Sequence, residues 1–248
     1  MPVALITGAN RGLGLAFARA YVARGWQVIA SARRPEGAGL LLELASQADG
    51  RLRVETLDIA NFSAIETLAE RLSNQPIDVL INNAALTGGP LGSFGHVDYA
   101  RWGEAFRINA MAPMKMMECF ADAVAASGRK VIFNLSSRIG ANPFFGYLEY
   151  FSSKSALNMV VKQASIALEP RGVIVVAAHP GWVGTEATAA QGKAPLTPEA
   201  AAAFLIKIID ELTVAQTGSF FDPDGSTLPL VTQQHEIKFY SKPRTATA

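Results

Sequence analysis

The sequence predicts one doubly wound α/β domain over residues 1–248, built on a mostly parallel seven-stranded sheet with helices on both faces. Two observations lead to this fold class. Short β-branched runs alternate along the chain with longer segments of helical period, and such alternation is typical of a parallel sheet covered on both sides. No Pro/Gly-rich linker, repeat or low-complexity segment divides the 248 residues, so one domain is favoured over two.

The expected elements follow the chain in order. Six strands are predicted at residues 3–7, 27–31, 52–57, 78–82, 130–135 and 173–178, with a weaker seventh at 218–221. Helices are predicted at 12–24, 62–73, 151–168 and 198–212. Thr197 can cap the last of these helices, and Pro198 suits its first turn. We expect a loosely held polar tail from about residue 233.

Composition and charge narrow the classes of function. The formal net charge of +1 gives no electrostatic footprint for nucleic acid or an anionic membrane, so we expect a small-molecule partner. Because Cys119 is the only cysteine, an internal disulfide is excluded, and we expect a buried, unreactive thiol. The absence of a signal-peptide pattern predicts a cytoplasmic protein. The longest apolar run, at 173–178, is too short to span a membrane. His96, His179 and His235 have no metal-ligand spacing, so no metal site is expected.

A glycine-rich turn joins the first predicted strand to the first helix in "LITGANRGLGLAFARAY". The spacing T-G-x-x-x-G-x-G differs from the usual dinucleotide fingerprint, and a tight turn without a ligand is the alternative interpretation. Its place at the first strand-helix junction favours a turn that lets a pyrophosphate approach backbone N–H groups. The cofactor contacts expected from this loop are Gly8, Asn10, Arg11, Gly12, Leu13 and Gly14.

The end of the second strand predicts which dinucleotide binds. An acidic side chain there would accept a hydrogen bond from a ribose 2'-hydroxyl, whereas arginine accommodates a 2'-phosphate. The chain offers Ser31, Arg33 and Arg34 before its first carboxylate, Glu36. Arginines are common on surfaces after strands, so NAD(H) stays possible, but these residues favour NADP(H).

The stretch "FFGYLEYFSSKSA" contains two tyrosines and one lysine. In a continuous helix Tyr147, Tyr150 and Lys154 share one face, so periodicity does not choose between the tyrosines. Only Tyr150 and Lys154 are a single turn apart, where an ammonium can act on a phenol. A Tyr-x-x-x-Lys pair also arises by chance, and the pair alone therefore decides nothing.

Seven motifs along the chain, taken together, resemble the short-chain dehydrogenase/reductase family, with its single-domain Rossmann fold. They are "TGANRGLG" at 7–14, "LDI" at 57–59, "NNAA" at 82–85, "INAMAP" at 108–113, "NLSSRIG" at 134–140, "YFSSK" at 150–154 and "PGWVGT" at 180–185. The resemblance covers essentially the whole chain. The later segment "GSFFDPDGSTLPL" resembles the sniffer and C-factor group of NADP-dependent carbonyl reductases.

The resemblance implies a catalytic tetrad. The serine that precedes two residues and a glycine is Ser137 rather than Ser136, and the family's tyrosine lies 13 positions later, at Tyr150. Lys154 and Asn109 match the remaining two members. Tyr147 fails the spacing and is expected in the substrate-pocket wall or in simple packing.

Further cofactor contacts are implied by the same matching. They are Asp58 and Ile59 for the adenine, Asn83, Ala84 and Ala85 in the loop against the cofactor, Tyr150 and Lys154 themselves, and Pro180, Gly181, Val183 and Thr185 near the nicotinamide. The motif "NNAA" ends in alanine where glycine is usual, and the stretch that follows residue 185 is short, which suggests a small lid. The resemblance also implies a homodimer or homotetramer.

The implied activity is reversible, NADPH-dependent reduction of an aldehyde or ketone to an alcohol. Tyr150 would donate the proton, its phenolate favoured by the Lys154 ammonium and an oxidised nicotinamide, while Ser137 holds the substrate oxygen and Asn109 holds a water for proton return. An apolar substrate pocket is expected from Phe144, Phe145, Tyr147 and Trp182, although aromatic residues also pack cores. The alternatives are a 3-oxoacyl-thioester reductase and a non-catalytic NADP(H)-sensing regulatory protein.

Overall fold

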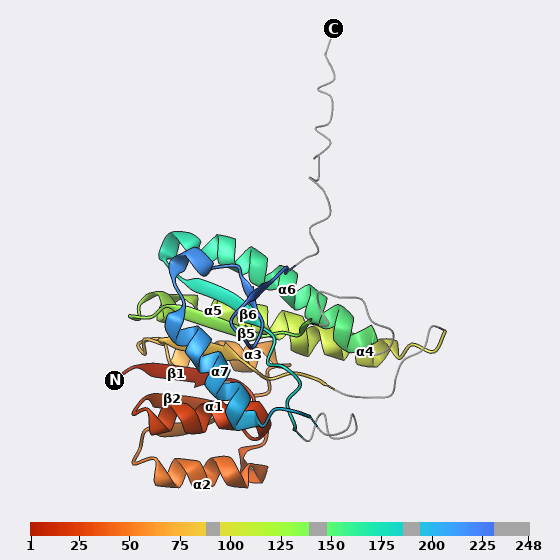
Figure 1. Ribbon diagram of the computed structural model, residues 1–248. Helices are drawn as coiled ribbons and strands as arrows, with labels where there is room; N and C mark the ends of the chain where they lie inside the picture. Colours follow the sequence, from red (N-terminus) through yellow and green to blue (C-terminus); the bar gives the residue numbers. More distant parts are fainter. Residues whose placement is uncertain (88–94, 139–147, 186–193, 231–248) are drawn as a thin grey trace.

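The computed structural model describes residues 1–87, 95–138, 148–185 and 194–230. Its strands form one eight-stranded sheet in the order β3-β2-β1-β4-β5-β6-β7-β8 (Figure 1). The strands are β1 (Val3–Ile6), β2 (Gln27–Ala32), β3 (Leu52–Thr56), β4 (Val79–Asn82), β5 (Val131–Leu135), β6 (Ile174–Ala178), β7 (Phe220–Phe221) and β8 (Thr227–Leu228). All neighbouring strands are parallel except β7 and β8. The predicted doubly wound fold is therefore confirmed.

The strand count differs from the prediction. Seven strands were expected, and the structure adds β8, which pairs antiparallel with β7 through the register Phe220↔Leu228. β7 itself covers only two residues of the predicted run 218–221. Two residues span a single period of side-chain alternation, so the sequence shows no repeat from which such a strand could be predicted. The hairpin is consequently visible only from its pairing.

The helices cover both faces of the sheet (Figure 1). They are α1 (Gly12–Ala23), α2 (Gly39–Gln47), α3 (Phe62–Arg71), α4 (Tyr99–Phe106), α5 (Ala112–Ala125), α6 (Leu148–Leu168) and α7 (Pro198–Glu211). The four predicted helices correspond to α1, α3, α6 and α7, with ends that differ by at most three residues. The predicted cap of α7 is present, because Thr197 Oγ1 accepts a hydrogen bond from Ala200 N at 3.2 Å.

Two buried apolar layers hold the helices to the sheet. One layer packs α1, α2 and α7 against one face, and the other packs α3, α5 and α6 against the opposite face. Successive residues of β1 divide between them: Ala4 and Ile6 belong to the first layer, and Val3 and Leu5 to the second. This division explains why the strands are apolar without interruption, since both faces of each strand are buried.

Helices α4 and α5 are joined by a five-residue π-helical segment, η2 (Arg107–Met111). The three elements follow one another without a break from Tyr99 to Ala125. Wider turns of this kind occur often at functional sites. This one carries Asn109, which is fully buried. In the described ranges, no helix has the length and apolar character needed to cross a bilayer.

Candidate active site

The glycine loop after β1 is shaped by close backbone approaches that only glycine permits. Gly8 has a φ of +66°, in the left-handed region. A Cβ atom on Gly14 would lie 2.3 Å from the carbonyl oxygen of Gly8 and 2.6 Å from Asn83 Nδ2. The loop therefore presents bare backbone at the N-terminus of α1, beside the exposed Asn10 and Arg11. Such a surface fits a dinucleotide pyrophosphate.

Two polar side chains fix this loop to the end of β4. Thr7 Oγ1 accepts hydrogen bonds from the backbone N–H groups of Asn83 and Ala84, at 3.0 and 3.1 Å. Asn83 Nδ2 donates in return to the carbonyl oxygens of Thr7 and Gly8, at 2.9 and 3.0 Å. The amide of Asn83 is thus committed to the loop, which makes Asn83 a positioning residue in this structure. Ala85, the next residue but one, is exposed.

The residues predicted to bind the 2'-phosphate, at and after the end of β2, differ in how far they are exposed to solvent. Arg33 and Arg34 are both exposed. Ser31 is fully buried, and its carbonyl oxygen accepts from Ala9 N at 2.8 Å. The Ser31 hydroxyl has no hydrogen-bond partner among the described residues, and its predicted contact with the cofactor stays a prediction.

The two residues predicted to contact adenine lie in the turn after β3. Asp58 is partly buried, and its Oδ1 accepts a hydrogen bond from Ala60 N at 3.0 Å. The neighbouring Ile59 is buried. Arg107 Nε, from η2, donates to the carbonyl oxygen of Ala60 at 2.6 Å. The predicted adenine contacts thus sit in a turn held by its own carboxylate and by the π-helical segment.

At the end of β5, the two adjacent serines have separate partners. Ser136 Oγ donates to Asn158 Oδ1 of α6 at 2.6 Å, and both groups are buried. Ser137 hydrogen bonds with the side chain of Tyr150, an interaction that lowers the pKa of the phenol. The structure therefore brings together the serine and tyrosine that the motif spacing selected.

Burial dominates the titration of the tyrosine and lysine pair. It raises the pKa of Tyr150 to about 12, against the smaller lowering by the Ser137 hydrogen bond. It lowers the pKa of Lys154 to about 7. Lys154 Nζ lies 5.7 Å from the centroid of the Tyr150 ring and donates to the carbonyl oxygen of Leu135 at 2.7 Å. Burial is the main cause of both shifts, and the predicted stabilisation of the phenolate by the Lys154 ammonium stays a prediction.

Asn109 is linked to α6 through Ser153 rather than directly to Lys154. Its Nδ2 donates to Ser153 Oγ at 2.9 Å and to Leu86 O at 3.0 Å, and its Oδ1 accepts from Leu86 N at 2.7 Å. Ser153 Oγ donates in turn to the carbonyl oxygen of Tyr150 at 2.8 Å. The side chain therefore holds the loop after β4 to the helix that carries Tyr150. The water that we expected Asn109 to hold stays a prediction.

The segment after β6 packs against the glycine loop. A Cβ on Gly12 would lie 3.2 Å from Thr185 Cγ2, and Gly181 has a φ of +80°. Val183 is buried and pairs with Leu196, while Pro180 is partly exposed. The predicted nicotinamide-side residues are consequently adjacent to the predicted pyrophosphate site, although they lie about 170 positions later in the chain.

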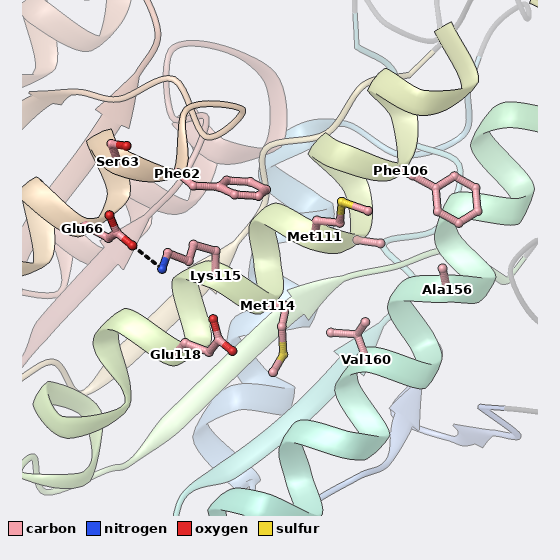
Figure 2. Close-up of a pocket in the computed structure, with 11 residues that line it drawn as sticks. Phe62, Ser63, Glu66, Phe106, Met111, Met114, Lys115, Glu118, Ala156 and Val160 are labelled. Atoms are coloured by element: carbon pink, nitrogen blue, oxygen red, sulfur yellow. Dashed lines mark ion pairs between the residues drawn. The ribbon is translucent and has the colours of Figure 1, made fainter. Parts of the chain in front are cut away.

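The predicted substrate pocket is only partly described. Phe144, Phe145 and Tyr147 lie outside the described residues, as does His235. Trp182 is described and its side chain is 43% exposed. A separate apolar groove of about 550 Å³ lies between α3, η2, α5 and α6, where Figure 2 shows Phe62, Met111, Met114 and Val160 around it. None of the four tetrad residues lines this groove, so it is distinct from the candidate active site.

Sequence reasoning missed several residues that organise the site. They are Thr7 as the acceptor for the β4 loop, Leu135 as the partner of Lys154, Ser153 as the link to Asn109, and the pair Arg138 and Asp222 beside Ser137. All of these contacts join segments far apart in sequence, and the motifs do not predict which residues will meet. Within the described ranges, no group of three His, Cys, Asp or Glu side chains could hold a metal ion.

Comparison with known proteins gives a consistent set of relatives. The family model for short chain dehydrogenases matches residues 2–195. The structure of carbonyl reductase Sniffer of D. melanogaster is 29% identical, with a TM-score of 0.84 over 92% of this chain and 99% of that one. A carbonyl reductase from Pseudomonas aeruginosa PAO1 in complex with NADP is 33% identical, with a TM-score of 0.81 over 92% and 99%. C-signal of Myxococcus xanthus is 34% identical over 66% of this chain and 99% of its own length.

Proposed function

Because the chain belongs to the short-chain dehydrogenase/reductase family, we propose that it reduces an aldehyde or ketone to an alcohol, reversibly, with NADPH as its preferred cofactor. One observation carries the proposal. The hydroxyl of Ser137 is hydrogen bonded to the phenol of Tyr150, and Lys154 lies one helical turn away, at the same edge of the sheet as the glycine loop. Phenol, hydroxyl and ammonium are the groups that a carbonyl oxygen needs as negative charge develops on it.

Three residues have separate roles in the proposed carbonyl reduction. Ser137 Oγ donates a hydrogen bond to the carbonyl oxygen, which polarises it and fixes its position. Tyr150 Oη donates the proton that this oxygen takes up, and the Lys154 ammonium stabilises the charge left on the phenol oxygen. The cofactor supplies the hydride to the carbonyl carbon when it is bound. In the oxidative direction Tyr150 Oη takes the proton back from the alcohol.

The acid–base behaviour of the site supports this assignment. A phenol whose pKa burial raises to about 12 is protonated at neutral pH, as the donor in a reduction must be. A weak acid of this kind transfers its proton slowly unless charge favours the phenolate. Lys154, with its pKa lowered to about 7, carries that charge for part of the time near neutrality. Binding of an anionic cofactor beside Lys154 would raise the charged fraction.

The residues present fit NADP(H). The glycine loop leaves backbone surface for the pyrophosphate, and Arg33 and Arg34 are exposed after β2. Two structural relatives, from chicken fatty liver and from P. aeruginosa, are described as binding NADPH and NADP. NAD(H) is the weaker alternative because the first acidic side chain after β2, Glu36, comes only after Arg33 and Arg34.

Two further parts of the proposal concern the substrate and the assembly. We propose an uncharged or weakly polar carbonyl substrate, with Trp182 in the pocket wall together with Phe144, Phe145 and Tyr147. We also propose a homodimer or homotetramer, supported by the apolar groove and by Met111 and Met159, which are 52% and 46% exposed. Sedimentation of the purified chain measures the assembly, and a monomer at micromolar concentration would contradict it.

The test of the activity is a panel of carbonyl compounds assayed by loss of NADPH absorbance. The panel contains aldehydes, ketones, a dicarboxylate, a sugar phosphate and a 3-oxoacyl thioester, each with NADPH and with NADH. We expect turnover of neutral aldehydes or ketones, absent in Tyr150→Phe. Preference for the thioester would favour the 3-oxoacyl-thioester reductase. NADPH binding without turnover of any compound would favour the regulatory protein.

A further inference from the structure

The carboxyl ends of β5, β6 and β7 form a row of residues beside Tyr150. Leu135, Ala178 and Phe221 are neighbours across the three strands. The sheet continues one step further, because Ser136 N donates to Ala178 O and His179 N donates to Phe221 O, both at 2.8 Å. Ser137 and Arg138 follow directly, at the point where the sheet ends.

An ion pair spans this row from its first strand to its third. The Arg138 guanidinium binds the Asp222 carboxylate through two groups: Nη2 contacts Oδ2, and Nε donates to Oδ1 at 3.3 Å. The Asp222 side chain is only 8% exposed, whereas that of Arg138 is 53% exposed. A nearly buried carboxylate is costly without a partner. Because the guanidinium makes two contacts, it fixes the orientation of the Asp222 carboxylate as well as its distance from Arg138.

The ion pair lies near His179, the first residue of the segment that packs on the glycine loop. His179 lies in the row between the strands of Arg138 and Asp222, and both charged groups act on its imidazole. Burial lowers the pKa of His179 to about 4, so the imidazole is neutral at neutral pH. One cation and one anion therefore balance each other beside Ser137.

We propose that Arg138 and Asp222, as a bridge across β6, are positioning residues that hold Ser137 in its hydrogen bond with Tyr150. The covalent link is short, because Arg138 is the next residue after Ser137. The bridge therefore ties the residue after Ser137 to the residue that follows β7. The catalytic part of this inference rests on the proposed reductase activity, whereas the structural part does not.

The catalytic test compares Arg138→Gln, Arg138→Lys, Asp222→Asn and the double variant Arg138→Gln/Asp222→Asn. We expect kcat to fall about tenfold in Arg138→Gln and Asp222→Asn, with the NADPH dissociation constant within twofold of the parent. Arg138→Lys should recover part of kcat, since it keeps the charge. The double variant should lose no more than the worse single variant. Additive losses, or equal losses of kcat and NADPH affinity, would overturn the bridge as a positioning device.

The structural test needs no turnover. Hydrogen exchange followed by mass spectrometry should show faster exchange in peptides covering 133–138 and 176–181 of Arg138→Gln, by about tenfold, with α7 unchanged. Arg171→Gln is the matched control, because it also removes an Arg–Asp pair, with Asp122 at 2.6 Å, away from this edge. Unchanged exchange in Arg138→Gln would overturn the proposal. Faster exchange with a parent that reduces no carbonyl would contradict the proposed function and retain the bridge.

Discussion

The predicted cofactor half of the candidate active site, at the ends of β1 to β4, differs in construction from the predicted catalytic half, at the ends of β5 to β7. The cofactor half depends on backbone: Gly8 and Gly14 allow close approach, and Thr7 and Asn83 tie that backbone to the neighbouring loop. The catalytic half depends on side chains: Ser137, Tyr150 and Lys154 come from two separate elements and meet through buried contacts. A backbone that requires glycine can be recognised from the sequence, whereas side-chain contacts between distant segments cannot.

The largest effect is expected in the catalytic half, from Tyr150→Phe. Loss of the proton donor should lower kcat for carbonyl reduction by about 100- to 10,000-fold. NADPH should still bind, because the ring and its packing remain. Steady-state rates and fluorescence titration with NADPH measure the two properties. Tyr147→Phe is the control and should retain most activity; an inactive Tyr147→Phe with an active Tyr150→Phe would reverse the assignment.

In the cofactor half, Gly14→Ala should be the most disruptive single change. The added Cβ would lie 2.3 Å from a backbone oxygen, and overpacking of this kind costs about 1–3 kcal/mol or more. We expect a lower melting temperature together with weakened NADPH binding, both measurable by thermal melts with and without cofactor. Gly103→Ala is the control, since nothing lies within 4 Å of its added Cβ. Equal behaviour of the two variants would mean that the close approach is unimportant.

Arg33→Ala tests whether Arg33 determines the preference for NADPH over NADH or only supports the structure of the loop. Each charge-assisted hydrogen bond to a phosphate contributes roughly 1.5–3 kcal/mol, so NADPH affinity should fall by about 10- to 150-fold. NADH affinity should barely change, because NADH has no 2'-phosphate. Arg34→Ala should cost less if the pleat of β2 continues. Dissociation constants of both cofactors decide the matter: equal losses for NADPH and NADH would assign Arg33 to the fold or the adenine.

The last prediction concerns the thermodynamic stability of the catalytic half rather than its activity. Burial lowers the pKa of Lys154 from 10.5 to about 7, so below pH 7 the folded protein pays the full cost of a buried ammonium, and this cost declines as pH rises toward 10.5. Lys154→Met removes it. The stability gained by Lys154→Met should therefore be greater at pH 6 than at pH 9, by about 3 kcal/mol. Denaturant melts measure this difference.

The control for that experiment is Lys162→Met, on the same helix, where the lysine is exposed. Its stability relative to the parent should not change between the two pH values. A pH-independent effect of Lys154→Met would show that Lys154 is hydrated, and that burial does not govern its titration.

Particular residues show how far prediction from sequence reaches. The strands from β1 to β6 and the helices α1, α3, α6 and α7 were predicted, because apolar period and capping residues are local signals. β8 was missed because it is two residues long and forms only by pairing with β7. The burial of Ser31 was not foreseen, since sequence gives the end of a strand but not which face a hydroxyl takes, and its cofactor contact stays a prediction. The roles of the tetrad residues remain predictions that the variants above test.

The sequence by itself determined the doubly wound fold, the family and the position of the glycine loop, because each is encoded in spacing along a continuous stretch. Only the tertiary structure decided the partners of the two serines: the Ser136 hydroxyl binds Asn158 of α6, and the Ser137 hydroxyl binds Tyr150. It also decided the direction of both pKa shifts at the site. Desolvation depends on every atom packed around a group, and those atoms come from segments that the sequence keeps far apart.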